Sequence, residues 1–151
     1  MPGHELGNDR LVTTVDLRNL TGVDAVLARA RAGLRRLGPH ETRAAVTAGA
    51  LLIDTRTDVQ RRQQGSLPGA IVIDRTVLEW RLDPESPHRI PEAADPDRVI
   101  VVVCRQGYSS SLAAASLRAV GLRNATDLVG GVEAWLAAGL PTATGPEDVR
   151  F

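Results

Sequence analysis

The chain contains one cysteine, Cys104, at the junction of two segments with different residue patterns. The five residues before it, 99–103, are all β-branched and aliphatic, which is typical of a strand buried on both faces. A polar loop follows the cysteine, and the Ala- and Leu-rich segment after that loop has the spacing of a helix. Open α/β sheets bind ligands at the carboxyl ends of their strands, and a helix amino terminus favours negative charge there. We therefore predict that Cys104 is a nucleophile that reacts as a thiolate.

The loop after the cysteine has residue types that could stabilise a negative charge. Gly107 allows the tight backbone in which several amide groups converge on an anion. Arg105 adds a cation next to the thiol, and Tyr108, Ser109 and Ser110 add hydroxyl groups. Lowering the pKa of a thiol by about two units from its ordinary value near 8.5 makes it mostly ionised at neutral pH. We expect the loop to activate the thiol and to bind an anionic substrate.

Two classes of reaction use a strand, a cysteine loop and a helix in this order: phosphatase or arsenate-reductase chemistry, and sulfur transfer. Cysteine phosphatases need an arginine after five intervening residues to grip the phosphoryl group, and Ser110 occupies that position here. An arsenate reductase needs a second cysteine to resolve the modified thiol, and the chain has none. Both interpretations lack a required group, so sulfur transfer remains as the predicted chemistry.

The composition restricts the class of protein. A chain of 151 residues suits one domain with one hydrophobic core. Eighteen basic and eighteen acidic residues give a formal net charge of zero, which argues against a nucleic-acid partner. No apolar run reaches the ~20 residues of a membrane span, and residues 1–20 hold no apolar secretory segment, so we expect a cytoplasmic protein with no membrane partner. One cysteine and three histidines predict neither a disulfide nor a metal site, and we expect no cofactor.

The pattern along the chain predicts alternating strands and helices. Residues 1–20 lack a sustained period, and we expect them to form a flexible arm. Residues 21–38 predict an amphipathic, arginine-rich helical extension capped at Thr21, and residues 143–151 are expected to form a C-terminal tail. Short apolar runs bounded by polar residues or glycine predict further strands at 50–54, 70–74 and 125–129. This alternation is typical of a parallel α/β domain.

Four segments, in this order, resemble motifs of the rhodanese-like family, and the similarity extends over residues 36–142. LLIDTR (51–56) is similar to the family's first long strand with its Asp-x-Arg ending, and GSLPGAIVID (65–74) to its Gly-His-Ile-Pro-Gly-Ala segment. VVVCRQGYSS (101–110) is similar to its active loop, and LVGGVEAWLAAGLP (128–141) to its closing Gly-Gly-x-x-x-Trp helix. The resemblance implies a central five-stranded parallel sheet flanked by helices on both faces, with residues 35–37 as a short edge strand.

The resemblance also implies a reaction and the residues that carry it out. Cys104 would take the outer sulfur of a small sulfur-containing anion, hold it as a persulfide, and pass it to cyanide, a thiol or a protein. The arginine after the cysteine is like that of thiosulfate-using members. The implied persulfide-binding loop comprises Arg105, Gln106, Gly107, Tyr108, Ser109 and Ser110, with Asp54 and Arg56 as supporting residues that orient the loops.

The sequence departs from the family pattern at three places. Ser66 stands where the family usually has histidine, residues 57–64 lack an acidic-aromatic pair, and Gln106 replaces a basic residue of some efficient members. A second hypothesis is therefore a weakly catalytic or noncatalytic module that carries or senses sulfur, or that binds a protein partner through its arginine-rich first helix.

Overall fold

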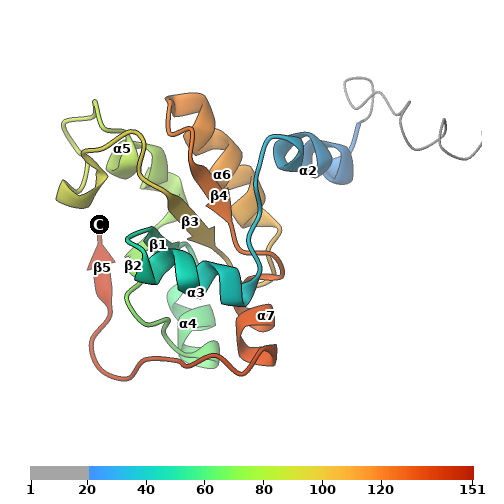
Figure 1. Cartoon of the computed structure of the whole chain (residues 1–151), viewed down its shortest axis with the longest axis vertical. Helices are drawn as coiled ribbons and strands as arrows, with labels where there is room; N and C mark the ends of the chain where they lie inside the picture. The colour runs from blue at the N-terminus through green and yellow to red at the C-terminus, as the bar shows by residue number, and fades with distance from the viewer. Residues whose placement is uncertain (1–20) are drawn as a thin grey trace, which may run out of the picture.

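A five-stranded, all-parallel sheet lies at the centre of the computed structural model, which describes residues 21–151 (Figure 1). The strands lie in the order β4-β3-β1-β2-β5, with bounds β1 (Leu51–Asp54), β2 (Ile71–Ile73), β3 (Ile100–Val103), β4 (Ala125–Asp127) and β5 (Asp148–Arg150). The α-helices are α2 (Val23–Ala32), α3 (Pro39–Thr47), α4 (Asp58–Gln64), α5 (Leu78–Leu82), α6 (Ser109–Val120) and α7 (Gly131–Ala137). Two 3₁₀ turns, η2 (Arg75–Val77) and η3 (Pro91–Ala93), lie on either side of α5. The predicted α/β fold with a central parallel sheet is confirmed.

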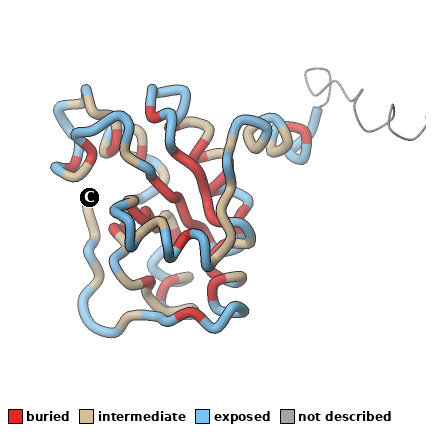
Figure 2. Tube along the Cα trace, in the orientation of Figure 1, coloured by how far each residue is buried: buried red, intermediate tan, exposed pale blue. Residues whose placement is uncertain are grey.

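Two hydrophobic layers cover the sheet because side chains alternate along each strand. Ile53 of β1 and Val102 of β3 belong to a cluster that includes Leu78 of α5 and Leu117 of α6. The other cluster draws on the opposite face of the same strands and on helix α7, with Leu52, Val101, Val103, Val132 and Trp135 among its members. The central strands are the most continuously buried part of the trace (Figure 2). Helices therefore cover both faces, as expected.

The polar ends of three neighbouring strands meet at the carboxyl edge of the sheet. In the register of the ladders, Asp54 of β1 lies beside Val103 of β3, and Asp127 of β4 lies beside Val102. Cys104 directly follows Val103. The parallel register thus brings the thiol and two buried carboxylates to the same edge.

The first helix is shorter than expected. It ends at Ala32 instead of near residue 38, and Gly22 occupies its N-cap position without any side-chain cap, so the predicted cap at Thr21 is wrong. Helix α2 packs against α6, with Ala25 as its buried residue, while Val23 is 73% exposed. Leu34 and Leu37, which were expected on the apolar face of this helix, lie after its end and pack against the two core clusters. Leu37 forms a parallel bridge with Leu128, so residues 35–37 contribute one isolated bridge and no full edge strand.

The fifth strand comes from the segment expected to be a tail. Strand β5 pairs in parallel with β2 at the edge of the sheet and brings the end of the chain to that edge (Figure 1). Arg150 forms an ion pair with Glu92, and Glu147, just before β5, forms one with Arg61. The sequence did not indicate this strand because Asp148-Val-Arg is short, polar and partly exposed.

The expected arm, 1–20, lies outside the described residues. Among residues 21–151, none of the helices has both the length and the apolar character needed to cross a bilayer.

Candidate functional site

Cys104 is one of the residues that line a cavity of about 240 Å³ at the carboxyl edge of the sheet. The residue is only 6% exposed, and its sulfur accepts hydrogen bonds from the backbone N–H of Gly107 at 3.1 Å and of Ser110 at 3.4 Å. The cavity is lined by Arg105, Gln106, Tyr108 and Ser109 of the loop and by Thr55, Arg56 and Gln60 from the segment after β1. The predicted nucleophile is therefore buried at the end of a strand but faces a cavity large enough for a small anion.

Opposing effects act on the pKa of the Cys104 thiol. Burial raises this pKa, but hydrogen bonds from the side chains of Ser110 and Ser109 and from the amides of Ser110 and Gly107 lower it, and the net pKa lies below its ordinary value. The Ser110 hydroxyl has a single proton and also lies 2.7 Å from Oδ2 of Asp127, to which it donates. The Ser109 hydroxyl and the two amides are thus the donors that remain available to a thiolate.

Glycines from two parts of the chain allow the cysteine loop to sit against the start of α7. Gly107 has φ +84°, and a Cβ there would lie 2.7 Å from the amide nitrogen of Gly130. A Cβ on Gly131 would lie 2.5 Å from the carbonyl oxygen of Cys104. The amides of Val132 and Glu133 donate to the carbonyls of Cys104 and Arg105 at 3.0 and 3.1 Å. The start of α7 therefore binds loop carbonyls, while amides of the loop remain free to face the sulfur.

The rim of the cavity carries the more exposed loop side chains. Arg105 is 49% exposed, and its Nε lies 3.5 Å from Glu133 Oε1. The Gln106 side-chain amide donates to the same carboxylate oxygen at 3.3 Å. Tyr108 is 59% exposed, and its ring lies under the guanidinium of Arg31. The cavity is thus lined by four of the six predicted loop residues, Arg105, Gln106, Tyr108 and Ser109. The other two, Gly107 and Ser110, donate to the sulfur through their amides.

Asp54 and Arg56 form a buried ion pair next to the site. Arg56 Nη2 lies 2.7 Å from Asp54 Oδ2, and both side chains are almost fully buried. The same nitrogen donates to the Gly65 carbonyl at 2.9 Å. The guanidinium is therefore engaged by protein groups, and the supporting role expected for this pair stays a prediction.

Sequence reasoning missed a buried carboxylate behind the loop. Asp127 is fully buried and accepts hydrogen bonds from the hydroxyls of Ser110 and Ser111, each at 2.7 Å. Arg36 forms an ion pair with it at 2.8 Å, and Arg31 donates to the Ser111 hydroxyl at 3.0 Å. The predicted strand, 125–129, places Asp127 at its centre, whereas β4 ends at this residue, so its place at the carboxyl edge of the sheet was not predicted.

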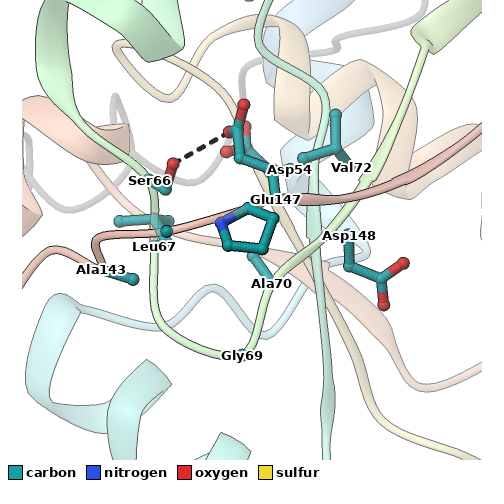
Figure 3. Close-up of a pocket in the computed structure, with 11 residues that line it drawn as sticks. Asp54, Ser66, Leu67, Gly69, Ala70, Val72, Ala143, Glu147 and Asp148 are labelled. Carbon is teal, nitrogen blue, oxygen red and sulfur yellow. Dashed lines mark hydrogen bonds between the residues drawn. The ribbon is translucent and has the colours of Figure 1, made fainter.

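A second cavity, of about 210 Å³, lies between the turn before β2 and the C-terminal segment and is not lined by Cys104 (Figure 3). Here the Ser66 hydroxyl points to Glu147 and donates to its Oε2 at 3.0 Å. Arg61 donates to the same oxygen at 2.8 Å. Ser66, which replaces the histidine expected from the family pattern, thus connects the turn to the segment that leads into β5.

Among residues 21–151, no group of three or more His, Cys, Asp or Glu side chains is arranged to hold a metal ion.

Several known proteins are similar to this chain in sequence. The chain is 34% identical over 106 residues to the thiosulfate sulfurtransferase GlpE of Pseudomonas savastanoi pv. phaseolicola, which covers 68% of this chain and 88% of that protein. It is also 34% identical over 99 residues to a protein named sulfurtransferase from Allochromatium vinosum, covering 66% of this chain and 83% of that protein.

Solved structures are also similar to this chain in fold. A Rhodopseudomonas palustris protein of unknown function, described as a possible tyrosine phosphatase, superposes with a TM-score of 0.74 at 29% identity over 82% of this chain and 95% of that one. A thiosulfate sulfurtransferase from Pseudomonas aeruginosa superposes with a TM-score of 0.65 at 25% identity, covering 80% of this chain and 22% of that one. The family model for the rhodanese-like domain matches residues 38–138, the part that holds the cysteine loop, the Gly-Gly turn and most of the sheet. By fold, motifs and sequence, the chain belongs to the rhodanese-like domain family.

Proposed function

We propose that the chain is a sulfurtransferase that moves sulfane sulfur from thiosulfate, or a similar donor, to a thiophilic acceptor through a persulfide on Cys104. One observation carries this proposal: Cys104 lines the cavity, and its sulfur accepts hydrogen bonds from two backbone amides of the loop. The names of the relatives support the same donor.

In the first step, the Cys104 thiolate attacks the outer sulfur of thiosulfate. The new sulfur–sulfur bond forms on Cys104, the sulfur–sulfur bond of the donor breaks, and sulfite leaves with that bond's electron pair. The loop amides stabilise the negative charge of the thiolate and of the persulfide that replaces it. Arg105, at the rim, offers a cation to the sulfonate end of the donor.

In the second step, a nucleophilic acceptor attacks the outer sulfur of the persulfide. The sulfur–sulfur bond breaks, and its electron pair returns to Cys104 as the thiolate. The chain has no second cysteine, so the acceptor comes from outside: cyanide, a small thiol or a partner protein. We place this chemistry in the cytoplasm, because a reducing compartment keeps a single thiol free.

The phosphatase description of one structural neighbour does not fit this site. Ser110 occupies the position of the phosphate-binding arginine, and its hydroxyl is directed to Asp127. Arg105 is the one arginine of the loop, and its guanidinium lies at the exposed rim beside Glu133. The site therefore suits a donor whose outer sulfur enters the cavity and whose charged end stays at the rim.

The test is to incubate the protein with thiosulfate and to measure its intact mass. We expect a gain of one sulfur atom, absent in Cys104→Ala, and release of that sulfur as thiocyanate when cyanide is added. A protein that gains no sulfur and forms no thiocyanate would instead be the noncatalytic module of the second hypothesis.

A further inference from the structure

Two arginines that precede the region matched by the family model reach the cysteine loop. Arg31, at the end of α2, donates from Nη2 to the carbonyl oxygen of Gly107 at 2.8 Å. Arg36 donates from its own Nη2 to the same oxygen at 3.1 Å. The family model begins at residue 38, so both side chains enter the site from outside the matched region.

We propose that Arg31 and Arg36 are positioning residues that hold the Gly107 carbonyl, and with it the peptide shared with the Tyr108 N–H, turned away from the sulfur of Cys104. This inference rests on the proposed function, since it assigns these arginines a part in activating the same thiol. Neither side chain is among those that line the cavity, so they act through the loop and not on the donor.

The conformation of Gly107 explains why its carbonyl needs to be held. With φ at +84° and no side chain, this residue has more backbone freedom than any other residue type would have at the same position. In a planar trans peptide, the carbonyl of Gly107 and the N–H of Tyr108 point in opposite directions. Rotation of this peptide would turn a carbonyl dipole towards the cavity, where it would repel a thiolate or a persulfide.

The two arginines are themselves fixed by several contacts. Arg36 forms the ion pair with the buried Asp127 and is only 18% exposed. Arg31 donates from Nε to the Ser111 hydroxyl at 3.0 Å, and its guanidinium lies 5.6 Å from the centre of the Tyr108 ring. Each guanidinium therefore bridges the Gly107 carbonyl to a second anchor, which gives the clamp a defined geometry.

The charged residues around the thiol include a control that distinguishes positioning of the loop by Arg31 and Arg36 from a general effect of their charge. The charged side chains next to the loop are those of Arg31, Arg36, Asp127, Arg105 and Glu133, and Arg56, paired with Asp54, also lines the cavity. Arg35 is an exposed arginine of the same segment whose side chain makes none of these contacts. Arg35→Gln therefore removes the same charge without touching the carbonyl and is the matched control.

The experiment measures the rate at which iodoacetamide alkylates Cys104 as a function of pH. In Arg31→Gln we expect the rising part of the rate profile to move to higher pH, with alkylation at pH values below the thiol pKa slowed about threefold to tenfold, as for a thiol pKa raised by 0.5 to 1 unit. Arg31→Lys, which can still donate to the carbonyl, should recover part of the loss. Arg36→Lys keeps a charge beside Asp127 but lacks the second nitrogen, and should shift the profile in the same direction.

Two results would overturn the proposal. One is an unchanged profile in folded Arg31→Gln and Arg36→Lys. The other is an equal shift in Arg35→Gln, because the effect would then be one of net charge. Alkylation needs no sulfur donor, so this outcome is independent of whether the protein accepts sulfur from thiosulfate. Thermal unfolding of each variant identifies any that do not fold. If one of the two arginine variants does not fold, the other one alone tests the proposal.

Discussion

The carboxylate of Glu133 lies 3.5 Å from Nε of Arg105, so the cation that follows the nucleophile in the sequence is paired with α7. Both side chains are about half exposed, and such pairs are weak because water and salt screen them. An anionic donor that uses Arg105 must compete with this carboxylate. Glu133 therefore sets how available the rim cation is.

Glu133→Gln should make the protein bind an anionic donor more tightly. The variant keeps the hydrogen-bonding shape of the side chain but frees the Arg105 cation, so we expect the KM for thiosulfate to fall about twofold to fourfold with little change in kcat. Steady-state kinetics at low and high salt measure the effect, which should shrink as the salt concentration rises. In an Arg105→Gln background the substitution should do almost nothing, and an equal fall in KM there would show that Arg105 is not the group released.

The lowered pKa of Cys104 predicts how sulfur loading depends on pH. Loading should increase with pH and level off below the pH at which an ordinary thiol would do so, because the thiolate is the attacking group. Ser109→Ala removes one of the donors that lower this pKa and should move the rising part of the curve to higher pH. The ultraviolet absorbance of the thiolate, with Cys104→Ala as the blank, measures the titration directly. A curve at the same pH in Ser109→Ala would show that the amides alone stabilise the charge.

The same pKa predicts a small effect on stability. Because the pKa is lower in the folded protein than in the unfolded chain, the thiolate stabilises the fold fully at pH values above the unfolded pKa. That contribution is lost as the pH falls through the folded value. Denaturant unfolding at several pH values should show this dependence in the wild type and not in Cys104→Ala.

The parts of the site that local sequence could predict are those within one strand, loop and helix. The β-branched run before Cys104, the glycine in the loop and the Ala/Leu-rich segment after it each indicate their own local structure, and the parallel fold then places the thiol at a sheet edge. The contact between Arg31 and Gly107 joins residues 76 positions apart and depends on how α2 packs on α6. Neither hydrophobic periodicity nor turn propensity contains that information, because both report only on neighbours in sequence.

The fifth strand, β5, also could not be predicted from local sequence, for a different reason. Apolar runs predict strands whose side chains are buried, whereas β5 is three residues long and has no buried side chain. Its place in the sheet depends on the ladder with β2 and on the ion pairs of Glu147 and Arg150. These are partners supplied by other parts of the chain, so residues 143–151 read as a tail when taken alone.

Arg56→Leu should lower the free energy of unfolding by about 3–5 kcal/mol, since it leaves the carboxylate of Asp54 buried without its cation. If the pair only supports the loops, the sulfur loaded per folded molecule should stay near the wild-type value at a temperature well below unfolding. Denaturant unfolding and intact mass measure the two quantities. The double variant Asp54→Leu/Arg56→Leu removes both charges and should be more stable than Arg56→Leu alone. A loss of loading in folded Arg56→Leu would instead assign the guanidinium a contact with the donor.

Gly131→Ala should disrupt the site more than a comparable substitution elsewhere in the same helical region. A Cβ at Gly131 would lie 2.5 Å from the Cys104 carbonyl and 2.7 Å from the backbone of Arg105, at a φ of +61°. Neither neighbour is a flexible side chain, so the loop or α7 must shift, at about 2–4 kcal/mol of stability. Gly139→Ala is the matched control, because its φ is +73° and a Cβ there meets nothing within 4 Å. It carries only the left-handed penalty of about 1 kcal/mol.

We expect Gly131→Ala to load sulfur much more slowly and Gly139→Ala at nearly the wild-type rate, as measured by intact mass. Equal loading in the two variants would mean that the approach of α7 to the cysteine loop contributes to packing but not to the geometry of the thiol.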